Sequence, residues 1–333
     1  MQIEFLGSGG AITTPRPGCA CRLCVEAQAK GVPYSRGGPS VFVHGPNVLI
    51  DTPEEIKAEL LRSRVTQIDA ALEAVNGRVP VIAGSGAITT RDAIAHSQRA
   101  ERAGVDALSI LTPYFITPSQ DEIYAYYADI AAAVSLPILG YSNPQRAVVK
   151  IAPATLGRLA RDIPHFIGVK DSSGDVAETA AIIRACPPDF KVFVGRDTLI
   201  YPSLCIGAAG TVALTVNVAP RLAVGIYEAF QAGDHARAHA LQERLSILRE
   251  GLPRFGSYPV WVKEAMALQG LPAGPTRKPI LPLRDEQRAE PGGLIGIVAQ
   301  GREIGAAGML IDAAVRVERS FWRPLTRVAW LVG

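Results

Sequence analysis

The stretch HFIGVK, residues 165–170, is followed at once by DSSGD, residues 171–175. The first part is a short apolar run typical of a buried strand, and the second is a polar, glycine-bearing stretch typical of a loop. Lys170 therefore lies at the carboxyl end of a predicted strand, beside an opening loop. Barrel enzymes place their reactive groups at this end of their strands, including amines that act as nucleophiles.

Similar runs recur along the chain and predict six strands, at residues 79–83, 106–111, 136–139, 166–169, 191–194 and 211–214. Helix-like segments lie between them. Residues 90–103 open with a threonine cap and close before Gly104, and residues 119–134 begin with a capping box of Ser119 and Glu122. Alternating strands and helices predict a parallel sheet, and runs that are apolar on both faces predict that both of its faces are covered.

Doubly wound sheets and (β/α)8 barrels both fit this alternation. Tyr141 follows the run 136–140 and Lys170 follows the run 166–169, an interval of 170 minus 141, or 29 residues. One β/α unit takes about 30 residues. Both side chains are therefore expected at the carboxyl ends of neighbouring strands, which favours the barrel, because barrels assemble their sites on that face.

Composition indicates a globular protein with one large core or two modest ones, since 48% of the 333 residues are hydrophobic and 20% are charged. The 34 basic and 31 acidic residues nearly balance, with no basic run, so no nucleic-acid partner is expected. Five cysteines make no disulfide framework, and the amino terminus lacks the pattern of a secretion signal. A cytoplasmic protein is expected.

Lys170 suggests imine chemistry. The amine of a free lysine has a pKa of about 10.4, and burial at an apolar barrel mouth would favour its neutral, nucleophilic form. Attack on a 2-oxo acid gives an imine, and the hydroxyl of Tyr141 could relay protons. Arg146, five residues further on, could bind the substrate carboxylate. The alternative is a solvated strand-end lysine beside a packing tyrosine.

Five separated segments resemble the dihydrodipicolinate synthase and N-acetylneuraminate lyase family, in family order: residues 77–86, 112–115, 141–146, 168–174 and 217–220. The resemblance covers about residues 71–290. It implies a (β/α)8 barrel with a helical carboxyl-terminal region, usually tetrameric. It also implies a Schiff-base aldolase acting on pyruvate or a related 2-oxo acid, with no cofactor or metal.

The resemblance assigns roles to individual residues. Lys170 resembles the imine-forming lysine and Tyr141 the proton-relay tyrosine. Arg146 resembles the carboxylate-binding arginine, while Gly195 and Val212 fall where family members line the pocket.

Two departures from the family pattern favour an alternative, a catalytically impaired chimera with a structural role. The tyrosine that synthases lend to a neighbouring subunit falls at Phe115, which has no hydroxyl. The Gly-Thr-Thr-Gly-Glu segment, whose threonines complete the relay, is absent from the sequence.

Residues 1–70 resemble instead the opening of metallo-β-lactamase-fold phosphodiesterases, chiefly at residues 3–10 and 45–55. The His-x-His-x-Asp-His metal motif of those proteins does not follow, which argues against a metal-dependent phosphodiesterase. Cys19, Cys21 and Cys24 have zinc-like spacing, but a tetrahedral site needs a fourth ligand, so a partial or empty site is expected.

The resulting prediction is an α/β, TIM-barrel-like fold whose first two β/α units are replaced. Residues 1–70 form the metallo-β-lactamase-like fragment and residues 71–220 the barrel units. Residues 221–290 form the helical region, with helices at 221–232, 234–250 and 257–269, and residues 291–333 an unassigned extension. Residues 3–7 and 48–51 are expected to supply two further barrel strands. The expected assembly is a homodimer or homotetramer with no membrane partner, although residues 303–332 could form an amphipathic helix that docks on protein or on a membrane surface.

Overall fold

A computed structural model describes residues 2–7, 40–44, 48–50, 67–78, 80–251, 253, 256–269, 276 and 279–289. The predicted cysteine cluster, Cys19, Cys21 and Cys24, and the extension at residues 291–333 lie outside these residues.

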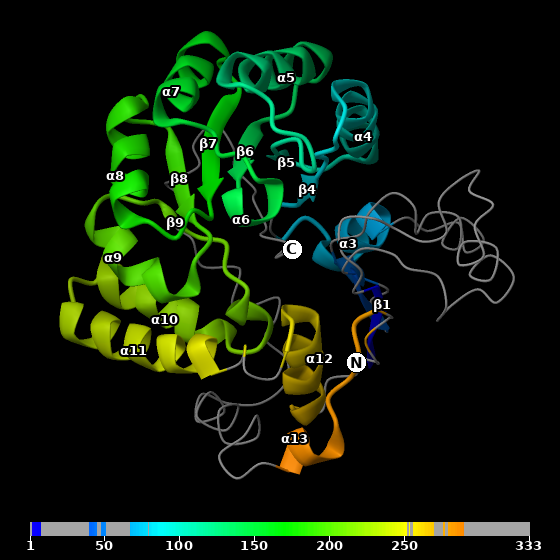
Figure 1. The fold of residues 1–333 in the computed structure, drawn as a ribbon, viewed down its shortest axis with the longest axis vertical. Coiled ribbons are helices and arrows are strands. Elements are labelled where there is room, and N and C mark those ends of the chain that lie inside the picture. The colour runs from blue at the N-terminus through cyan, green and yellow to red at the C-terminus, as the bar shows by residue number, and fades with distance from the viewer. Residues whose placement is uncertain are drawn as a thin grey trace, which may run out of the picture.

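The centre of the molecule is a six-stranded parallel sheet (Figure 1) with the order β4-β5-β6-β7-β8-β9. Each strand neighbours the next one along the chain, as in a barrel and not as in a doubly wound sheet. All six predicted strands are confirmed: β4 (Ile82–Gly84), β5 (Ala107–Leu111), β6 (Ile138–Ser142), β7 (Phe166–Asp171), β8 (Lys191–Val194) and β9 (Gly210–Thr211).

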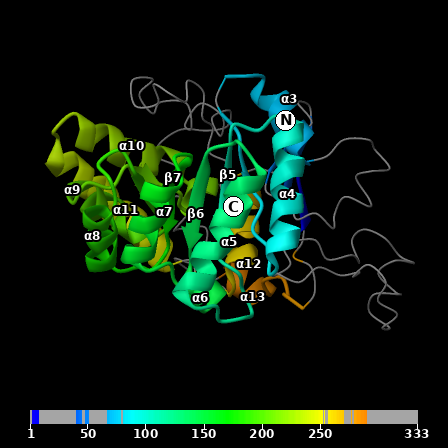
Figure 2. The ribbon, with the colours of Figure 1, turned by 90° about the horizontal axis from the view of Figure 1, so that it is seen from above.

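Helices cover the outside of this sheet in an arc (Figures 1 and 2). They are α4 (Thr90–Ala103), α5 (Gln120–Ala133), α7 (Pro153–Asp162), α8 (Val176–Ala185) and α9 (Ile200–Cys205). The predicted capping box of α5 is present, since Ser119 accepts from the backbone of Glu122 and the Glu122 carboxylate accepts from the backbone of Ser119. The Thr89 side chain caps α4, and Gly104 ends it with a φ of 89°. The helix boundaries thus follow from local capping chemistry.

The two faces of the sheet bury different cores. The outer face packs on the helices and carries most of the buried apolar residues, including Ile110, Val169 and Val194. The inner face has its own smaller cluster, made of Ile82, Ala107, Leu139, Phe193 and Val212. Because side chains alternate along a strand, each residue of β6, β7 or β8 faces either the helices or the interior. As the runs that are apolar on both faces predicted, both faces bury apolar residues.

The amino-terminal strands do not close the barrel, contrary to the expectation from the sequence. Strands do form at β1 (Gln2–Gly7) and β3 (Val48–Ile50), but both pair with β2 (Ser40–His44) in a separate antiparallel sheet. Only residues 45–47 join β2 to β3. Two parallel strands need a connection of a dozen or more residues between them. The short link between β2 and β3 therefore favours the antiparallel pair that they form. Within the described ranges, β4 and β9 end the parallel sheet, which is a half-barrel of six strands.

The chain after the sheet is helical. It consists of α10 (Pro220–Gln231), α11 (His235–Gly251), α12 (Tyr258–Leu268) and the short α13 (Asp285–Ala289), while α3 (Gln67–Val75) precedes the sheet and lies against β3. A buried aspartate, Asp197, ties this region to the end of β8. Its carboxylate accepts from the Thr215 backbone at 2.6 Å and from Arg249 Nε of α11 at 3.3 Å. The backbone carbonyl of Asp197 accepts from Gln242 at 3.0 Å.

Candidate active site

Lys170 and Tyr141 lie together at the carboxyl ends of β7 and β6. They are paired in register across the two strands, and Lys170 Nζ lies 4.2 Å from the centre of the Tyr141 ring. Lys170 is also in register with Phe193 of β8, a member of the inner cluster. The lysine and the tyrosine therefore share the inner face, and the predicted adjacency of their strand ends is confirmed.

The Tyr141 hydroxyl has several polar neighbours. The Asn143 amide donates to it at 3.0 Å. Burial acts to raise the pKa of Tyr141, but the charge of Lys170 and hydrogen bonds with Asn143, Ser172 and Lys170 outweigh burial and lower the pKa below the ordinary tyrosine value. A hydroxyl with a lowered pKa beside an amine is suited to pass protons to and from groups on that amine.

Replacing Ser172 by alanine is expected to raise the pKa of Tyr141, because one hydrogen bond to its ionised form is lost. The lowered pKa stabilises the fold only at alkaline pH, and this contribution disappears as the pH falls through the pKa in the folded protein. The measurement is phenolate absorbance against pH, with a Tyr141→Phe variant subtracted to remove the other tyrosines. Ser135→Ala, in a distant loop, is the control, and an unchanged Tyr141 titration in Ser172→Ala would contradict the assignment.

Gly195, directly after β8, and Ser172, directly after β7, are in tight contact. A Cβ atom at Gly195 would collide with Ser172 Oγ and would lie 3.2 Å from the Asp171 carbonyl oxygen. Ser172 is itself buried. Val212, the other predicted pocket residue, belongs to the inner cluster, and its backbone donates to the Val194 carbonyl at 3.0 Å. Gly195 thus follows β8, the strand next to β7, and Val212 follows β9, which lies one strand further on.

Gly195→Ala is expected to cost about 1–3 kcal/mol of stability, because the added methyl group must displace Ser172. The loss should be smaller when Ser172 is already alanine, so a double-mutant cycle measured by urea unfolding should show coupling between the two positions. Purely additive effects would show that the Ser172 hydroxyl does not set the clearance at Gly195.

A buried carboxylate holds the loop that opens beside Lys170. Asp171 accepts from the Ser173 backbone at 2.9 Å, from the Ser173 hydroxyl at 3.0 Å and from the Thr179 hydroxyl of α8 at 2.7 Å. Asp171 is in register with Ser142 and with Val194 of the outer core, so it faces the helices. Lys170 therefore faces the interior of the half-barrel, whereas the next residue, Asp171, faces the helices and holds the loop.

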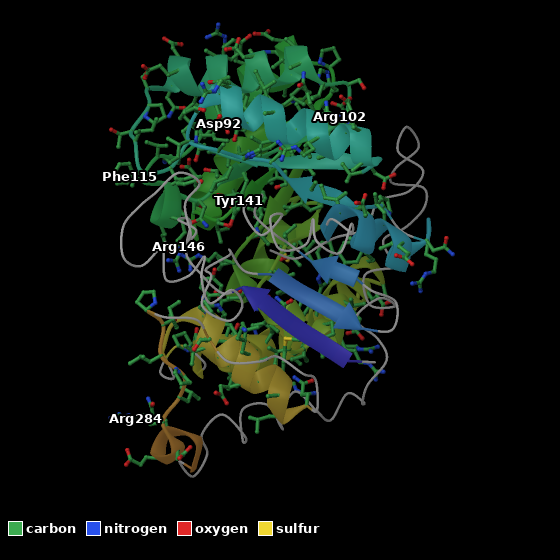
Figure 3. The ribbon with its side chains drawn as sticks, turned by 90° about the vertical axis from the view of Figure 1, so that its right-hand side faces the viewer. Asp92, Arg102, Phe115, Tyr141, Arg146 and Arg284 are labelled. Carbon is green, nitrogen blue, oxygen red and sulfur yellow. The ribbon has the colours of Figure 1, made fainter. Side chains whose placement is uncertain are left out.

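Arg146 lies on the short helix that follows β6, and its contact is with the helical region. It belongs to α6 (Pro144–Ala147), is exposed, and places its guanidinium carbon 5.6 Å from the ring centre of Tyr258 in α12. Figure 3 shows Arg146 below Tyr141, with Phe115 on the same side of the molecule. Phe115 is 83% exposed and has a φ of 74°.

Two polar partners of Tyr141, Asn143 and Ser172, were not singled out from the sequence. Their position in the sequence could have identified them, since Asn143 lies two residues after Tyr141 and Ser172 two residues after Lys170.

Two histidines, His235 and His239, lie in α11, where the His235 ring approaches the Tyr201 hydroxyl at 3.3 Å. The described side chains contain no group of three or more metal-ligating residues placed to hold an ion. None of the described helices is both long and apolar enough to span a membrane.

Comparison with known proteins decides the family. The model of the dihydrodipicolinate synthetase family matches residues 59–296. The chain belongs to this family. It is 36% identical over 241 residues to the 4-hydroxy-tetrahydrodipicolinate synthase of Bacillus subtilis, covering 72% of this chain and 83% of that protein. It is 40% identical over 269 residues to an uncharacterized DapA-like lyase of Halobacterium salinarum, covering 80% and 82%.

Solved structures of family members superpose on the half-barrel. The 4-hydroxy-tetrahydrodipicolinate synthase of Methylacidiphilum fumariolicum SolV has a TM-score of 0.66 at 32% identity, covering 71% of this chain and 78% of that one. YagE of E. coli K12, a member of the dihydrodipicolinic acid synthase family crystallised with pyruvate, has a TM-score of 0.66 at 28% identity, covering 71% and 79%. The family match begins at residue 59, so the predicted boundary at residue 70 is corrected: residues 59–70, assigned above to the phosphodiesterase-like fragment, belong to the match. The match does not include residues 1–58, and their resemblance to phosphodiesterases stays a prediction.

Proposed function

We propose that the protein is a Schiff-base lyase or synthase that acts on pyruvate or a related 2-oxo acid, with Lys170 as the nucleophile. The observation that carries this proposal is the placement of Lys170 Nζ 4.2 Å from the ring of Tyr141, at the carboxyl ends of adjacent strands. The relatives of this chain are named as synthases and as a lyase, which supports the proposal. In the proposal Lys170 and Tyr141 are the two groups that imine chemistry needs.

The chemistry starts with attack of the neutral Lys170 amine on the keto carbon of the 2-oxo acid. The carbonyl oxygen takes up a proton, and the amine nitrogen loses one, to give a carbinolamine. The Tyr141 hydroxyl then donates a proton to the departing hydroxyl group, water leaves, and the imine forms. The electron-poor imine permits loss of a proton, or cleavage of a carbon–carbon bond, at the adjacent carbon.

The other site residues have supporting roles in this proposal. Arg146 binds a substrate carboxylate at the rim, because its planar fork matches both oxygens. Gly195 and Val212 line the pocket wall. The enzyme works in the cytoplasm as a dimer or tetramer, with no cofactor.

Borohydride reduction in the presence of pyruvate tests the proposal directly. The full chain should gain the mass of one carboxyethyl group, and peptide mapping should place that group on Lys170. Labelling that leaves the peptide containing Lys170 unmodified would refute the assignment. Protein treated with borohydride alone is the control.

A catalytically impaired chimera remains the second candidate, because the parallel sheet has six strands in the described part of the chain and the Gly-Thr-Thr-Gly-Glu segment is absent from the sequence. The two candidates differ in turnover. Steady-state assays with pyruvate and aspartate semialdehyde should show product formation for the enzyme. For the chimera they should show none, even when Lys170 is trapped.

A further inference from the structure

Arg196 lies at the same end of the sheet as Lys170 and is not used by the chemistry described above. The strand β8 ends at Val194, and the Gly195 backbone donates to the Asp171 carbonyl at 2.6 Å. This hydrogen bond ties the start of the Arg196 loop to the residue directly after Lys170. Arg196 therefore follows the strand on one side of β7, whereas Arg146 follows β6 on the other side.

The guanidinium of Arg196 lies over the loop that opens beside Lys170. A Cβ atom built at Gly174 would lie 3.0 Å from Arg196 Nε and 3.5 Å from its Cζ. Gly174 also has a φ of 80°, which side chains rarely adopt. A glycine at this position thus leaves room for the guanidinium against the loop. Arg196 is half-buried there.

Three acidic residues on the loops next to Arg196 have other partners. Asp171 accepts from Ser173 and Thr179, Asp175 caps α8 by accepting from the Ala177 backbone at 2.8 Å, and Asp197 pairs with Arg249. No ion pair or hydrogen bond joins the Arg196 guanidinium to any residue that the structure describes. A half-buried arginine without an anionic partner is a ready site for the carboxylate of a ligand.

We propose that Arg196 binds a second carboxylate of the substrate held at Lys170, so that the site favours 2-oxo acids with an anionic group at the far end of the chain. This inference rests on the proposed imine chemistry. It names the class of compound that the enzyme cleaves or forms: a 2-oxo acid with two carboxylates. Arg146 and Arg196 would then hold the two ends of the substrate, with the keto carbon between them at Lys170.

The test uses two 2-oxo acids of equal chain length, 2-oxoglutarate and 2-oxopentanoate, which differ in the terminal group, a carboxylate or a methyl. The concentration of each that gives half-maximal borohydride trapping on Lys170 is measured in the full chain. We expect the wild type to favour 2-oxoglutarate by about tenfold, the strength of one charge-assisted contact. Arg196→Gln should bring the ratio close to one, and Arg196→Lys should keep part of the preference.

Arg184→Gln is the matched control, since Arg184 is exposed on α8 away from the site and should leave the ratio unchanged. A purely structural Arg196 would weaken trapping of both acids equally, and an unchanged ratio in Arg196→Gln would overturn the inference. Trapping of pyruvate but of neither five-carbon acid would overturn it as well, while the proposed function stands. Failure to trap pyruvate would remove the proposed function and this inference together.

Discussion

Replacing Lys170 by methionine should abolish borohydride trapping with pyruvate and lower turnover by at least about a thousandfold, as expected when the nucleophile of a covalent mechanism is removed. Methionine keeps much of the length of the side chain but has no amine to attack the keto carbon. The measurement is mass spectrometry of the reduced protein together with steady-state rates. A second effect should accompany the loss: the pKa of Tyr141 should rise, because the charge of Lys170 helps to lower it.

Lys150→Met is the matched control for this experiment. Lys150 pairs with Glu178 at 2.9 Å, and its side chain is 50% exposed, so its removal should leave trapping intact. Retained trapping in Lys170→Met would show that another amine forms the imine. Thermal unfolding of both variants separates a chemical loss from a loss of the fold.

Asp197→Ala is expected to destabilise the protein by about 3–5 kcal/mol, because it leaves the charge of Arg249 without its partner in a largely buried place. The Asp197 side chain is 2% exposed, and Thr215 loses an acceptor for its backbone and for its hydroxyl, which donates at 2.5 Å. The effect should appear as a lower midpoint of urea unfolding, monitored by circular dichroism.

A surface ion pair provides the comparison. Asp121→Ala removes the carboxylate that Arg158 contacts at 3.3 Å, and both of these side chains are at least half exposed. Such pairs contribute about 0–1 kcal/mol. Equal losses of stability from Asp197→Ala and Asp121→Ala would mean that the buried network at the end of β8 does not hold the helical region to the sheet.

The repeated parts of the fold could be predicted from the sequence because their signals are local. Strand runs such as residues 107–111 are mainly apolar. Side chains just before α4 and α5 cap the starts of these helices, and a glycine ends α4. The last strand is shorter than predicted, Gly210–Thr211 against residues 211–214, because the chain turns into a 3-10 helix at Thr215–Asn217.

The closure of the barrel could not be predicted in the same way, because pairing depends on which strands meet. Residues 3–7 and 48–51 have strand-like composition, and both segments contain strands. The unexpected strand β2 lies between them along the chain and pairs with both of its neighbours. Apolar composition identifies a strand but not its partner, and the short connection at residues 45–47 favours the nearest one.

In the candidate site, too, the local features could be predicted from the sequence and the long-range contacts could not. Lys170 and Tyr141 follow from strand ends one β/α unit apart, and their placement agrees with that spacing. The contact of Ser172 with Gly195 joins two loops, and Arg146 lies near Tyr258, more than a hundred residues further along the chain. Such contacts depend on how loops and helices meet in space, and the hydrophobic periodicity of the sequence does not predict them.

The dipeptide Lys170-Asp171 couples the proposed chemistry to the alignment of a single strand. Sliding β7 by one residue against β6 would turn the amine toward the helices and set a carboxylate opposite Tyr141, because neighbouring side chains point to opposite faces. The same slip would release the loop that Asp171 anchors. Molecules with this misalignment would form no imine at this position. The fraction of chains trapped by pyruvate and borohydride would therefore count the correctly folded molecules in a preparation.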